Sequence, residues 1–388
     1  MRRIAVVGAS GLVGSTLTER LLAQGADEIV PFIHSSGNAM RLARRGVELK
    51  MLDLMEPMQV EAALAGVTHV VNCSRGSDEV MLTGLRNLLA ASRKHRVERF
   101  VHLSSVAVYG DPPPPESSAE DAPALPARGT YGWIKLQQDR LVAKAAVEGV
   151  PSVILCPPNI SGPYSYYLVS LVNALRSGTF ALLDDGSAPC NLIDVGNLSY
   201  AIELALGDGP ADGARMFVTD DADTSWRSVV EGVLPLVEQG SPVPRIGREQ
   251  LTGDPPAGRE RPLSLMRSLK HLVSSDVREA MRKDPLWEKV DFAVRRSVAR
   301  MGKSMESRLR LSVEGPIKVA KVASRQRWEP ALCRQQLRGV RHSCELAKRR
   351  LGYRPVYSVP QSMQAFRNWY RASHGMDTAV WPLLRELY

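Results

Sequence analysis

The sequence predicts an α/β protein with a doubly wound parallel sheet and helices on both of its faces. In the first half of the chain, short apolar runs alternate with longer segments that repeat apolar residues every three to four positions. That alternation is typical of strand–helix–strand units, which build parallel sheets. The first apolar run, residues 4–7, continues into three glycines spaced three residues apart, after which a helical pattern begins. We therefore expect a first strand at residue 4, followed by a tight turn into a helix.

The three glycines have the spacing of a turn that binds a dinucleotide. Gly8 allows a sharp turn, Gly11 allows a pyrophosphate to approach the backbone, and Gly14 allows the helix to pack closely on the strand. The helix is expected over about residues 11–24, and the anion would lie at its N-terminus. The alternative is an ordinary tight turn with no ligand. The predicted dinucleotide contacts at this turn are Gly8, Ser10, Gly11, Leu12, Val13 and Gly14.

Residues 28–33 are expected to form the second strand, whose end would meet the adenosine ribose of the dinucleotide. A site that prefers NAD usually has an acidic residue there, which accepts a hydrogen bond from the ribose 2′-hydroxyl. This chain has His34 and Ser35 instead, followed by three arginines between positions 41 and 45. Hydroxyls and arginines suit a 2′-phosphate, so we expect NADP(H), with NAD as the alternative. The arginines could equally form the solvated face of the next helix.

The third and fourth strands are expected over residues 47–52 and 69–73. Asp53 and Leu54 follow the third strand, where a carboxylate can accept a hydrogen bond from the adenine amino group. Cys73 ends the fourth strand and is expected beside the cofactor. Ligands bind at the carboxyl ends of the strands in parallel sheets, so these residues should line one crevice.

Chemistry is expected at the end of the fifth strand, residues 99–104, which follows a helix predicted over about 78–95. Ser105 comes directly after this strand, and the proline-rich stretch 111–128 predicts a flap beside the site. Ser105 would therefore hold a substrate oxygen. A serine at a strand end more often only caps the backbone, so this assignment depends on its neighbours.

Tyr131 and Lys135 are four residues apart on the helix expected after the flap, so they share one face. The ammonium would lie near the phenol and favour the phenolate, lowering the phenol pKa from about 10 toward a value useful for proton transfer. We therefore predict a catalytic set of Ser105, Tyr131 and Lys135, in which Tyr131 moves the proton. The alternative is an exposed tyrosine and lysine on a solvated helix.

In these motifs the sequence resembles the extended short-chain dehydrogenase/reductases, also called the NAD-dependent epimerase/dehydratase family. The match covers about residues 1–230 and 340–375. The resemblance implies a Rossmann domain that binds NAD(P), a smaller C-terminal domain that binds a small-molecule substrate, and a homodimer. It also implies that Tyr131 and Lys135 contact the cofactor, with Lys135 on the nicotinamide ribose, and that Pro158 lies beside it. The matching motifs are the glycine turn, Asp53-Leu54, Ser104-Ser105, Val108 to Gly110, Tyr131 with Lys135, residues 157–163, residues 185–187, residues 347–355 and Trp369-Tyr370.

One departure from the family pattern bears on the substrate. Members that act on nucleotide sugars usually grip the pyrophosphate with an arginine where this chain has Cys190 and Asn191. We therefore expect UDP- and dTDP-sugars to bind poorly, although Arg176, Arg215 or a basic residue of the insertion could supply the charge. The predicted activity is hydride transfer between NAD(P) and a secondary alcohol or ketone. The alternatives are a nucleotide-sugar epimerase or dehydratase that recycles NAD, and a regulator that senses NADP without chemistry.

The predicted domains are a dinucleotide-binding domain over residues 1–165, with a return segment at about 190–210, and a substrate domain over 166–388. The substrate domain includes a basic insertion at about 241–335. Residues 241–350 hold 26 Lys or Arg against 12 Asp or Glu, while the chain as a whole carries a net charge of +9. The remainder of the chain is acidic, so a nucleic-acid partner is not expected.

Amphipathic basic helices are predicted in the insertion, between positions 263 and 311. They would pack as a lid on the substrate domain or lie on an anionic membrane surface. No stretch of the sequence approaches the roughly 18 apolar residues of a membrane span, and residues 4–7 are too short for a signal peptide, so a cytoplasmic protein is expected. The five cysteines contain no CxxC pair, which indicates neither a disulfide framework nor a metal site.

Overall fold

The computed structural model of the chain describes residues 1–36, 39–237, 242–248, 250, 328 and 330–374. Packing divides the chain into two units: Met1–Arg248 with Trp328–Tyr388, and Glu249–Arg327. The basic helices predicted between positions 263 and 311 lie outside the described residues, and so does the choice between a lid and a membrane contact. The predicted domain boundary at residue 165 stays a prediction, since both of its sides fall in the first unit.

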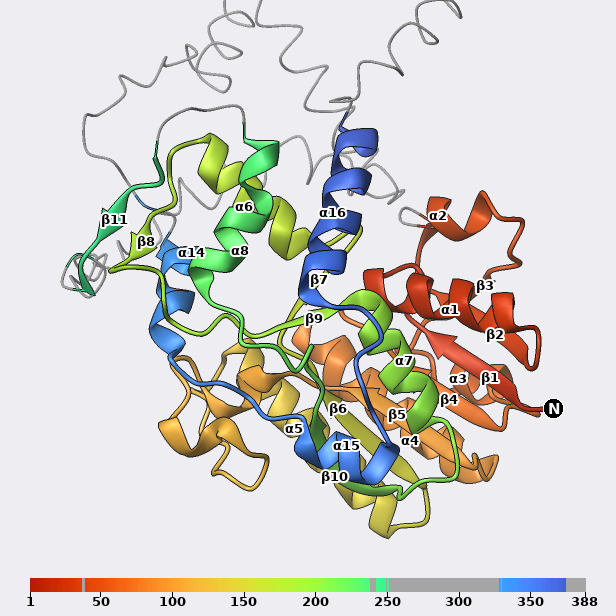
Figure 1. Ribbon diagram of the computed structural model, residues 1–388. Helices are drawn as coiled ribbons and strands as arrows, with labels where there is room; N and C mark the ends of the chain where they lie inside the picture. Colours follow the sequence, from red (N-terminus) through yellow and green to blue (C-terminus); the bar gives the residue numbers. More distant parts are fainter. Residues whose placement is uncertain (37–38, 238–241, 249, 251–327, 329, 375–388) are drawn as a thin grey trace, which may run out of the picture. The chain divides into compact units, whose positions relative to one another are not determined.

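A seven-stranded parallel sheet forms the centre of the first unit, in the order β10-β6-β5-β4-β1-β2-β3 (Figure 1). The direction in which strands are added reverses between β1 and β4. A doubly wound sheet binds its ligand at such a reversal, in the crevice outside the carboxyl ends of the strands. The strands are β1 (Arg3–Val7), β2 (Glu28–Ile33), β3 (Lys50–Met51), β4 (His69–Asn72), β5 (Arg99–Leu103), β6 (Ser152–Cys156) and β10 (Asp212–Phe217).

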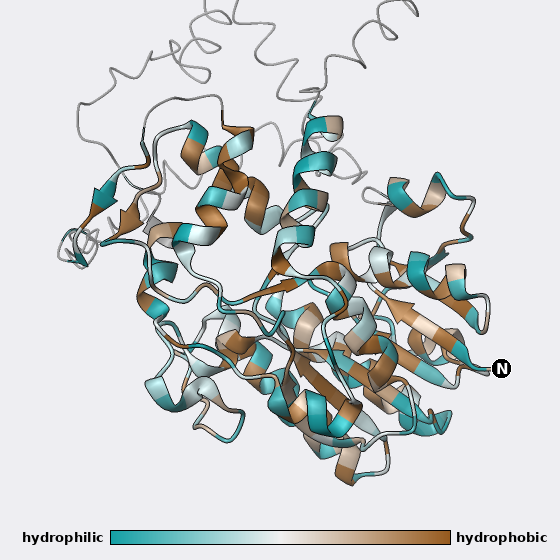
Figure 2. Cartoon of the chain, viewed as in Figure 1, coloured by the Kyte–Doolittle hydropathy of each residue, from teal (hydrophilic) through white to brown (hydrophobic). Residues whose placement is uncertain are grey.

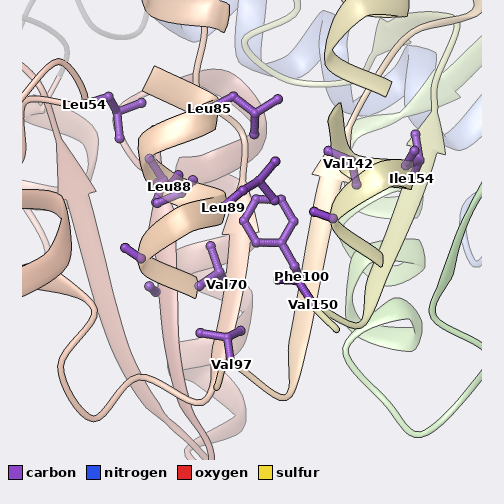
Figure 3. Packing of buried hydrophobic residues seen from close by; sticks show 14 of the residues in the cluster. Leu54, Val70, Leu85, Leu88, Leu89, Val97, Phe100, Val142, Val150 and Ile154 are labelled. Carbon is purple, nitrogen blue, oxygen red and sulfur yellow. The ribbon is translucent and has the colours of Figure 1, made fainter. Parts of the chain in front are cut away.

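Helices pack on both faces of this sheet, and each face has its own apolar cluster. Along β5, Phe100 belongs to one cluster and Val101 to the other, because successive side chains of a strand point to opposite faces. Figure 3 shows the first cluster, with Leu88 of α4 and Val142 of α5 packed near Phe100. One face carries α1 (Leu12–Gln24), α2 (Met40–Ala43), α7 (Val195–Ala205) and α15 (Glu345–Leu351); the other carries α3 (Pro57–Ala63), η2 (Val80–Gly84), α4 (Leu85–Lys94) and α5 (Tyr131–Val147).

The strands are apolar along most of their length, as the brown colouring of the sheet in Figure 2 shows. Continuous apolar character is expected for strands that are covered on both faces. The predicted doubly wound sheet is therefore confirmed. Within the described residues, no helix has the length and apolar character needed to cross a bilayer.

Three strand predictions need correction. The apolar run at residues 150–160 predicts a sixth strand, but the structure has two strands there. Pro157 and Pro158 separate β6 from β7 (Asn159–Ser161), since proline lacks the N–H that a ladder needs. β7 pairs with β9 (Leu192–Asp194) outside the main sheet. The third strand is shorter than predicted, and the seventh, β10, lies beyond the return segment expected at 190–210 and pairs with β6.

The remaining elements gather beside one end of the sheet, above it in the view of Figure 1. They include two segments distant in sequence, since β8 pairs with β11 and the stretch from Pro330 to Arg338 returns from beyond the insertion. These elements are α6 (Tyr166–Arg176), β8 (Leu182–Leu183), α8 (Trp226–Val233), η5 (Leu234–Leu236), β11 (Arg245–Ile246), α14 (Pro330–Arg334), η6 (Gln335–Arg338) and α16 (Val359–Ser373). Two further short turns, η3 (Val106–Tyr109) and η4 (Pro115–Ser118), lie in the segment between β5 and α5.

Candidate active site

The glycine turn after β1 brings three backbone segments into close contact. Gly8 has a φ of +84°, and a Cβ at this position would lie 2.9 Å from the Cys73 carbonyl carbon. A Cβ on Gly14 would lie 2.3 Å from the Gly8 carbonyl oxygen, so α1 packs directly on the turn. Gly11 differs, because its nearest neighbour would be the Gly8 oxygen at 3.4 Å. The protein interior therefore requires glycine at positions 8 and 14, whereas Gly11 leaves space that a ligand can use.

Helix α1 begins at this turn without a side-chain cap. Gly11 is the N-cap residue and has no side chain to accept from the amides of the first turn. The N–H groups of Leu12 and Val13 thus lie at a helix N-terminus that favours an anion. This arrangement, together with the space at Gly11, fits the pyrophosphate of a dinucleotide.

A cavity of about 470 Å³ lies at the reversal between β1 and β4. The ends of four strands contribute to its lining, as expected for a doubly wound sheet. Six of the predicted cofactor contacts do not line this cavity: Leu12, Val13 and Gly14, which begin α1, and Tyr131, Lys135 and Pro158. The predicted cofactor contacts that do line it are Gly8, Ser10, Gly11, His34, Ser35, Asp53, Leu54 and Cys73.

At the β2 end of the cavity, His34 and Ser35 are exposed. The arginines that follow do not line it. Arg41 lies 2.5 Å from Glu19 of α1, and Arg45 lies 2.8 Å from the same carboxylate. These two arginines are therefore engaged on α1, which leaves the side chains at positions 34 and 35 as the predicted phosphate contacts.

Ser105 caps the short η3 turn that follows β5. Its Oγ accepts a hydrogen bond from the Ala107 N–H at 3.2 Å. A hydroxyl that accepts in this way can still donate its own proton. The capping role and the predicted contact with a substrate oxygen are thus compatible.

The first turn of α5 packs against this same turn. Thr130 caps the helix by accepting from the Trp133 N–H, which fixes where α5 begins. A Cβ on Gly132 would lie 2.1 Å from the Ala107 carbonyl oxygen, so only glycine permits the approach. Tyr131, the first residue of α5, is thereby held next to the turn that begins at Ser105.

Lys135 is buried one turn further along α5, with only 4% of its surface exposed. Its Nζ donates a hydrogen bond to the Leu103 carbonyl oxygen at 2.8 Å and lies 6.0 Å from the centre of the Tyr131 ring. Burial lowers the pKa of Lys135 to about 8, while Asp139 acts in the opposite direction. At neutral pH the lysine therefore keeps its charge close to the phenol.

The predicted effect of this lysine on Tyr131 needs correction. Burial raises the pKa of the Tyr131 phenol, and the cation that acts against this rise is Arg75. The Arg75 guanidinium carbon lies 5.1 Å from the centre of the ring, whereas the Lys135 ammonium bonds to the Leu103 carbonyl. In this structure the phenol is thus protonated, which is the form that acts as an acid.

Arg75 was not among the predicted site residues. It follows β4 by three residues and lines the large cavity beside Ser74 and Gly76. Its position after the carboxyl end of a strand could have identified Arg75, because Asp53 and Ser105 were predicted as site residues on that basis. Asp139 was also missed, although it follows Lys135 by four residues on the same helix face.

A second, much smaller cavity, of about 20 Å³, lies between Pro158 and the segment that returns after the insertion. Cys190 lines it and contacts the Tyr167 hydroxyl at 3.3 Å. Arg338 also lines it, and its guanidinium makes two hydrogen bonds, of 3.0 and 2.8 Å, to the Asp111 carboxylate in the predicted flap. The flap is therefore hydrogen-bonded to η6, which is distant in sequence and which no sequence motif predicted at the site.

His342 provides a further tie between the same two segments. Its Nδ1 lies 2.8 Å from the Ser117 carbonyl oxygen, and the Ser343 N–H donates to the Ser118 carbonyl oxygen at 2.9 Å. Burial lowers the pKa of His342 to about 4, so this imidazole is neutral at physiological pH. The flap also contains a short helical turn, η4, where only irregular structure was expected.

Comparison with known proteins places these features in a family. The family model described as "NAD dependent epimerase/dehydratase family" matches residues 4–215. A UDP-glucose 4-epimerase of Corynebacterium glutamicum is 30% identical over 285 residues, which cover 65% of this chain and 85% of that protein. A ketoreductase of Stigmatella aurantiaca, which acts on a 4-hydroxy-2-methyl-3-oxo-4-farnesyl-3,4-dihydroquinoline-1-oxide, is 29% identical over 250 residues, 61% of this chain and 73% of that one.

Solved structures agree in fold. UDP-glucose 4-epimerase from Thermotoga maritima has a TM-score of 0.64 at 14% identity, covering 96% of this chain and 99% of its own. dTDP-glucose 4,6-dehydratase from Bacillus anthracis has a TM-score of 0.63 at 16% identity, covering 96% and 97%. Family match, relatives and solved structures agree with the doubly wound sheet described above. The chain belongs to the NAD-dependent epimerase/dehydratase family and is an NAD(P)-dependent enzyme of the extended short-chain dehydrogenase/reductase type.

Proposed function

We propose that this enzyme catalyses net hydride transfer between NADP(H) and a secondary alcohol or ketone of a small molecule. The observation that supports the proposal is the packing of Gly132 on Ala107, which brings the first turn of α5, with Tyr131 and the buried Lys135, against the turn that begins at Ser105. When bound, the nicotinamide supplies or accepts the hydride. A regulator that only sensed NADP would have no need of a buried cation behind a tyrosine, so we do not favour that alternative.

In the reducing direction, Ser105 donates a hydrogen bond to the carbonyl oxygen and Tyr131 gives that oxygen its phenolic proton. Loss of this proton leaves Tyr131 as a phenolate, which the Arg75 cation stabilises. Although burial raises the phenol pKa, 41% of the Tyr131 surface stays exposed, so the phenolate can regain a proton from solvent. In the oxidising direction the same groups act in reverse, with the phenolate as the base.

The proposed preference for NADP(H) rests on His34 and Ser35 at the end of β2. Among the residues that line the large cavity, the one carboxylate is Asp53 at the end of β3, so no acidic side chain there follows β2. A 2′-phosphate would meet no like charge beside His34 and Ser35. Calorimetric titration of the protein with NADPH and with NADH tests this preference. Tighter binding of NADPH supports it, and equal or tighter binding of NADH contradicts it.

A nucleotide-sugar epimerase or dehydratase is the second candidate, and Arg338 is the observation that favours it. Arg338 lines the smaller cavity with Cys190 and Asn191, so it could exchange Asp111 for a phosphate. Among the other cations considered, Arg176 bonds to the Leu236 carbonyl. We still expect UDP- and dTDP-sugars to bind poorly, because a phosphate would have to displace the Asp111 carboxylate from Arg338.

Two measurements separate the candidates. Mass spectrometry of the nicotinamide that copurifies with the protein addresses the reaction type, because tightly retained NAD indicates an internal redox cycle and loosely bound NADP(H) indicates net oxidation or reduction. Thermal-shift screening with sugar nucleotides in the presence of cofactor addresses the substrate. Strong stabilisation by a UDP- or dTDP-sugar would overturn the preferred candidate. We also propose a homodimer, which sedimentation of the full chain tests.

A further inference from the structure

A buried group of charged and polar side chains lies behind Lys135. Asp139, one turn further along α5, is 3% exposed, and Ser104 at the carboxyl end of β5 is 4% exposed. Arg215 of β10 extends toward the same carboxylate, with its Nη1 4.0 Å from Asp139 Oδ2. Polar side chains from α5, from the end of β5 and from β10 thus gather around the Asp139 carboxylate.

The Asp139 carboxylate is not saturated by direct contacts. Among the described residues, neither of its oxygens accepts a hydrogen bond of good geometry, and Ser104 Oγ and Arg215 Nη1 are likewise unsatisfied. Burial raises the pKa of Asp139 to about 6, while Ser104, Arg215 and Lys135 lower it. A buried carboxylate costs stability unless it is paired, so its presence at this site calls for a role beyond packing.

We propose that Asp139 is a positioning residue whose buried carboxylate, one helical turn from Lys135 on α5, keeps that lysine in its ammonium form. The inference rests on the proposed function only in assigning Lys135 a part in catalysis. It concerns a group that touches neither substrate nor cofactor and that acts through the lysine.

The charges around Lys135 support this role. Burial and the Arg75 cation both disfavour the ammonium. Cys73 faces Lys135, and burial raises its pKa to about 12, so this thiol is uncharged. Burial also raises the pKa of Cys156 and Tyr131 and lowers that of His102 well below its usual value, so each of these groups is neutral near pH 7. Asp139 is therefore the anion, among the described residues that act on Lys135, that favours its charged form.

The experiment is a pH titration of Lys135 in the full-length protein without ligands. Lysine labelled with ¹³C at Cε reports the charge of each ammonium by NMR, and Lys135→Arg identifies the signal. Wild-type protein should show a main step near pH 8 and a smaller step near pH 6, where Asp139 takes up its proton. A single step with no inflection near pH 6 contradicts the proposal, and once the signal is assigned this result comes from the wild-type protein alone.

Asp139→Asn keeps the shape of the side chain and removes its charge. We expect the Lys135 midpoint to fall by about one pH unit or more. Asp220→Asn is the matched control, because Asp220 is a buried carboxylate with a pKa also raised to about 6, bonded to Asn197 instead of facing Lys135. The control should leave Lys135 unchanged, and Asp139→Glu should restore the wild-type titration. An unchanged Lys135 midpoint in Asp139→Asn would overturn the proposal.

The titration needs no substrate, so it fails independently of the proposed function. If Tyr131→Phe retained activity while Asp139→Asn still shifted Lys135, the electrostatic role would stand and the catalytic assignment would fall. If Tyr131→Phe were inactive and the Lys135 titration were insensitive to Asp139, the catalytic assignment would stand and the electrostatic role of Asp139 would be wrong.

Discussion

The two halves of the site are built in different ways. The cofactor half, around Gly8 and Gly14, consists of backbone segments so close that a single added carbon would collide with them. The reactive half, around Tyr131, consists of side chains that come from α5, from the loop after β4 and from the turn after β5. Backbone geometry at the first half follows from residues adjacent in sequence, whereas the charges at the second half depend on how distant segments meet.

The cofactor half therefore depends on backbone shape, and the reactive half depends on the balance of charges. A turn whose glycines lack space for a Cβ has one workable sequence, so its spacing is informative. A proton-transfer site needs only a suitable phenol pKa, which burial raises and nearby cations lower. Different residues can supply those opposing effects. Arg75 and Asp139 provide it here without belonging to any motif recognised in the sequence.

The largest effect should come from adding one methyl group to the turn. Gly14→Ala would place a carbon 2.3 Å from the Gly8 carbonyl oxygen, so we expect the free energy of unfolding to fall by about 2 kcal/mol or more and dinucleotide binding to be lost. Gly11→Ala is the matched control, since its added carbon meets no atom closer than 3.4 Å. It should unfold within about 1 kcal/mol of wild type and still weaken the dinucleotide. Equal stability of the two variants in urea would contradict the difference between these glycines.

The same contrast explains how much the sequence could predict. Strand and helix alternation, the glycine turn and the Tyr131 and Lys135 pair are local patterns, and the sheet follows from them. The division of the sixth strand was also a local matter, visible in Pro157 and Pro158, and was missed. The pairing of Arg338 with Asp111 joins positions 227 residues apart, and no local pattern indicates such a contact.

The sign of the pKa change at Tyr131 shows the limit of spacing arguments. A lysine at i+4 was expected to lower the phenol pKa, but spacing gives no information on burial or on where the ammonium bonds. Lys135 bonds to the Leu103 carbonyl, and the surrounding protein raises the phenol pKa. Only the packed structure determines which effect is larger.

The second prediction concerns pH. Lys135 has a pKa lowered from 10.5 to about 8, so its ammonium is present below pH 8 and is lost above it. The rate of carbonyl reduction should therefore decline above about pH 8 and fall roughly tenfold per further unit if the ammonium is essential. A rate that stays level to pH 10 would show that the charge of Lys135 is not required.

A smaller effect is expected from Arg75→Met. Removing this cation removes an influence that favours the phenolate, so the pKa of Tyr131 should rise further. Alcohol oxidation, which needs the phenolate, should slow by about threefold to tenfold at pH 7 and recover at higher pH. Arg86→Met, the same change at an exposed arginine of α4, should leave the pH profile unaltered. If Arg75→Met left it unaltered as well, the role of Arg75 at Tyr131 would be wrong.

The most direct test of the account is Tyr131→Phe, measured for cofactor affinity and turnover in the same preparation. Tyr131 belongs to the reactive half of the site, so calorimetry should give a dissociation constant for the nicotinamide cofactor close to that of wild type. Turnover of a confirmed substrate should fall about 100-fold or more, because only the proton-transferring hydroxyl is lost. Turnover above about a tenth of the wild-type rate, with the fold and the cofactor affinity intact, would contradict the assignment of Tyr131 as the acid and base.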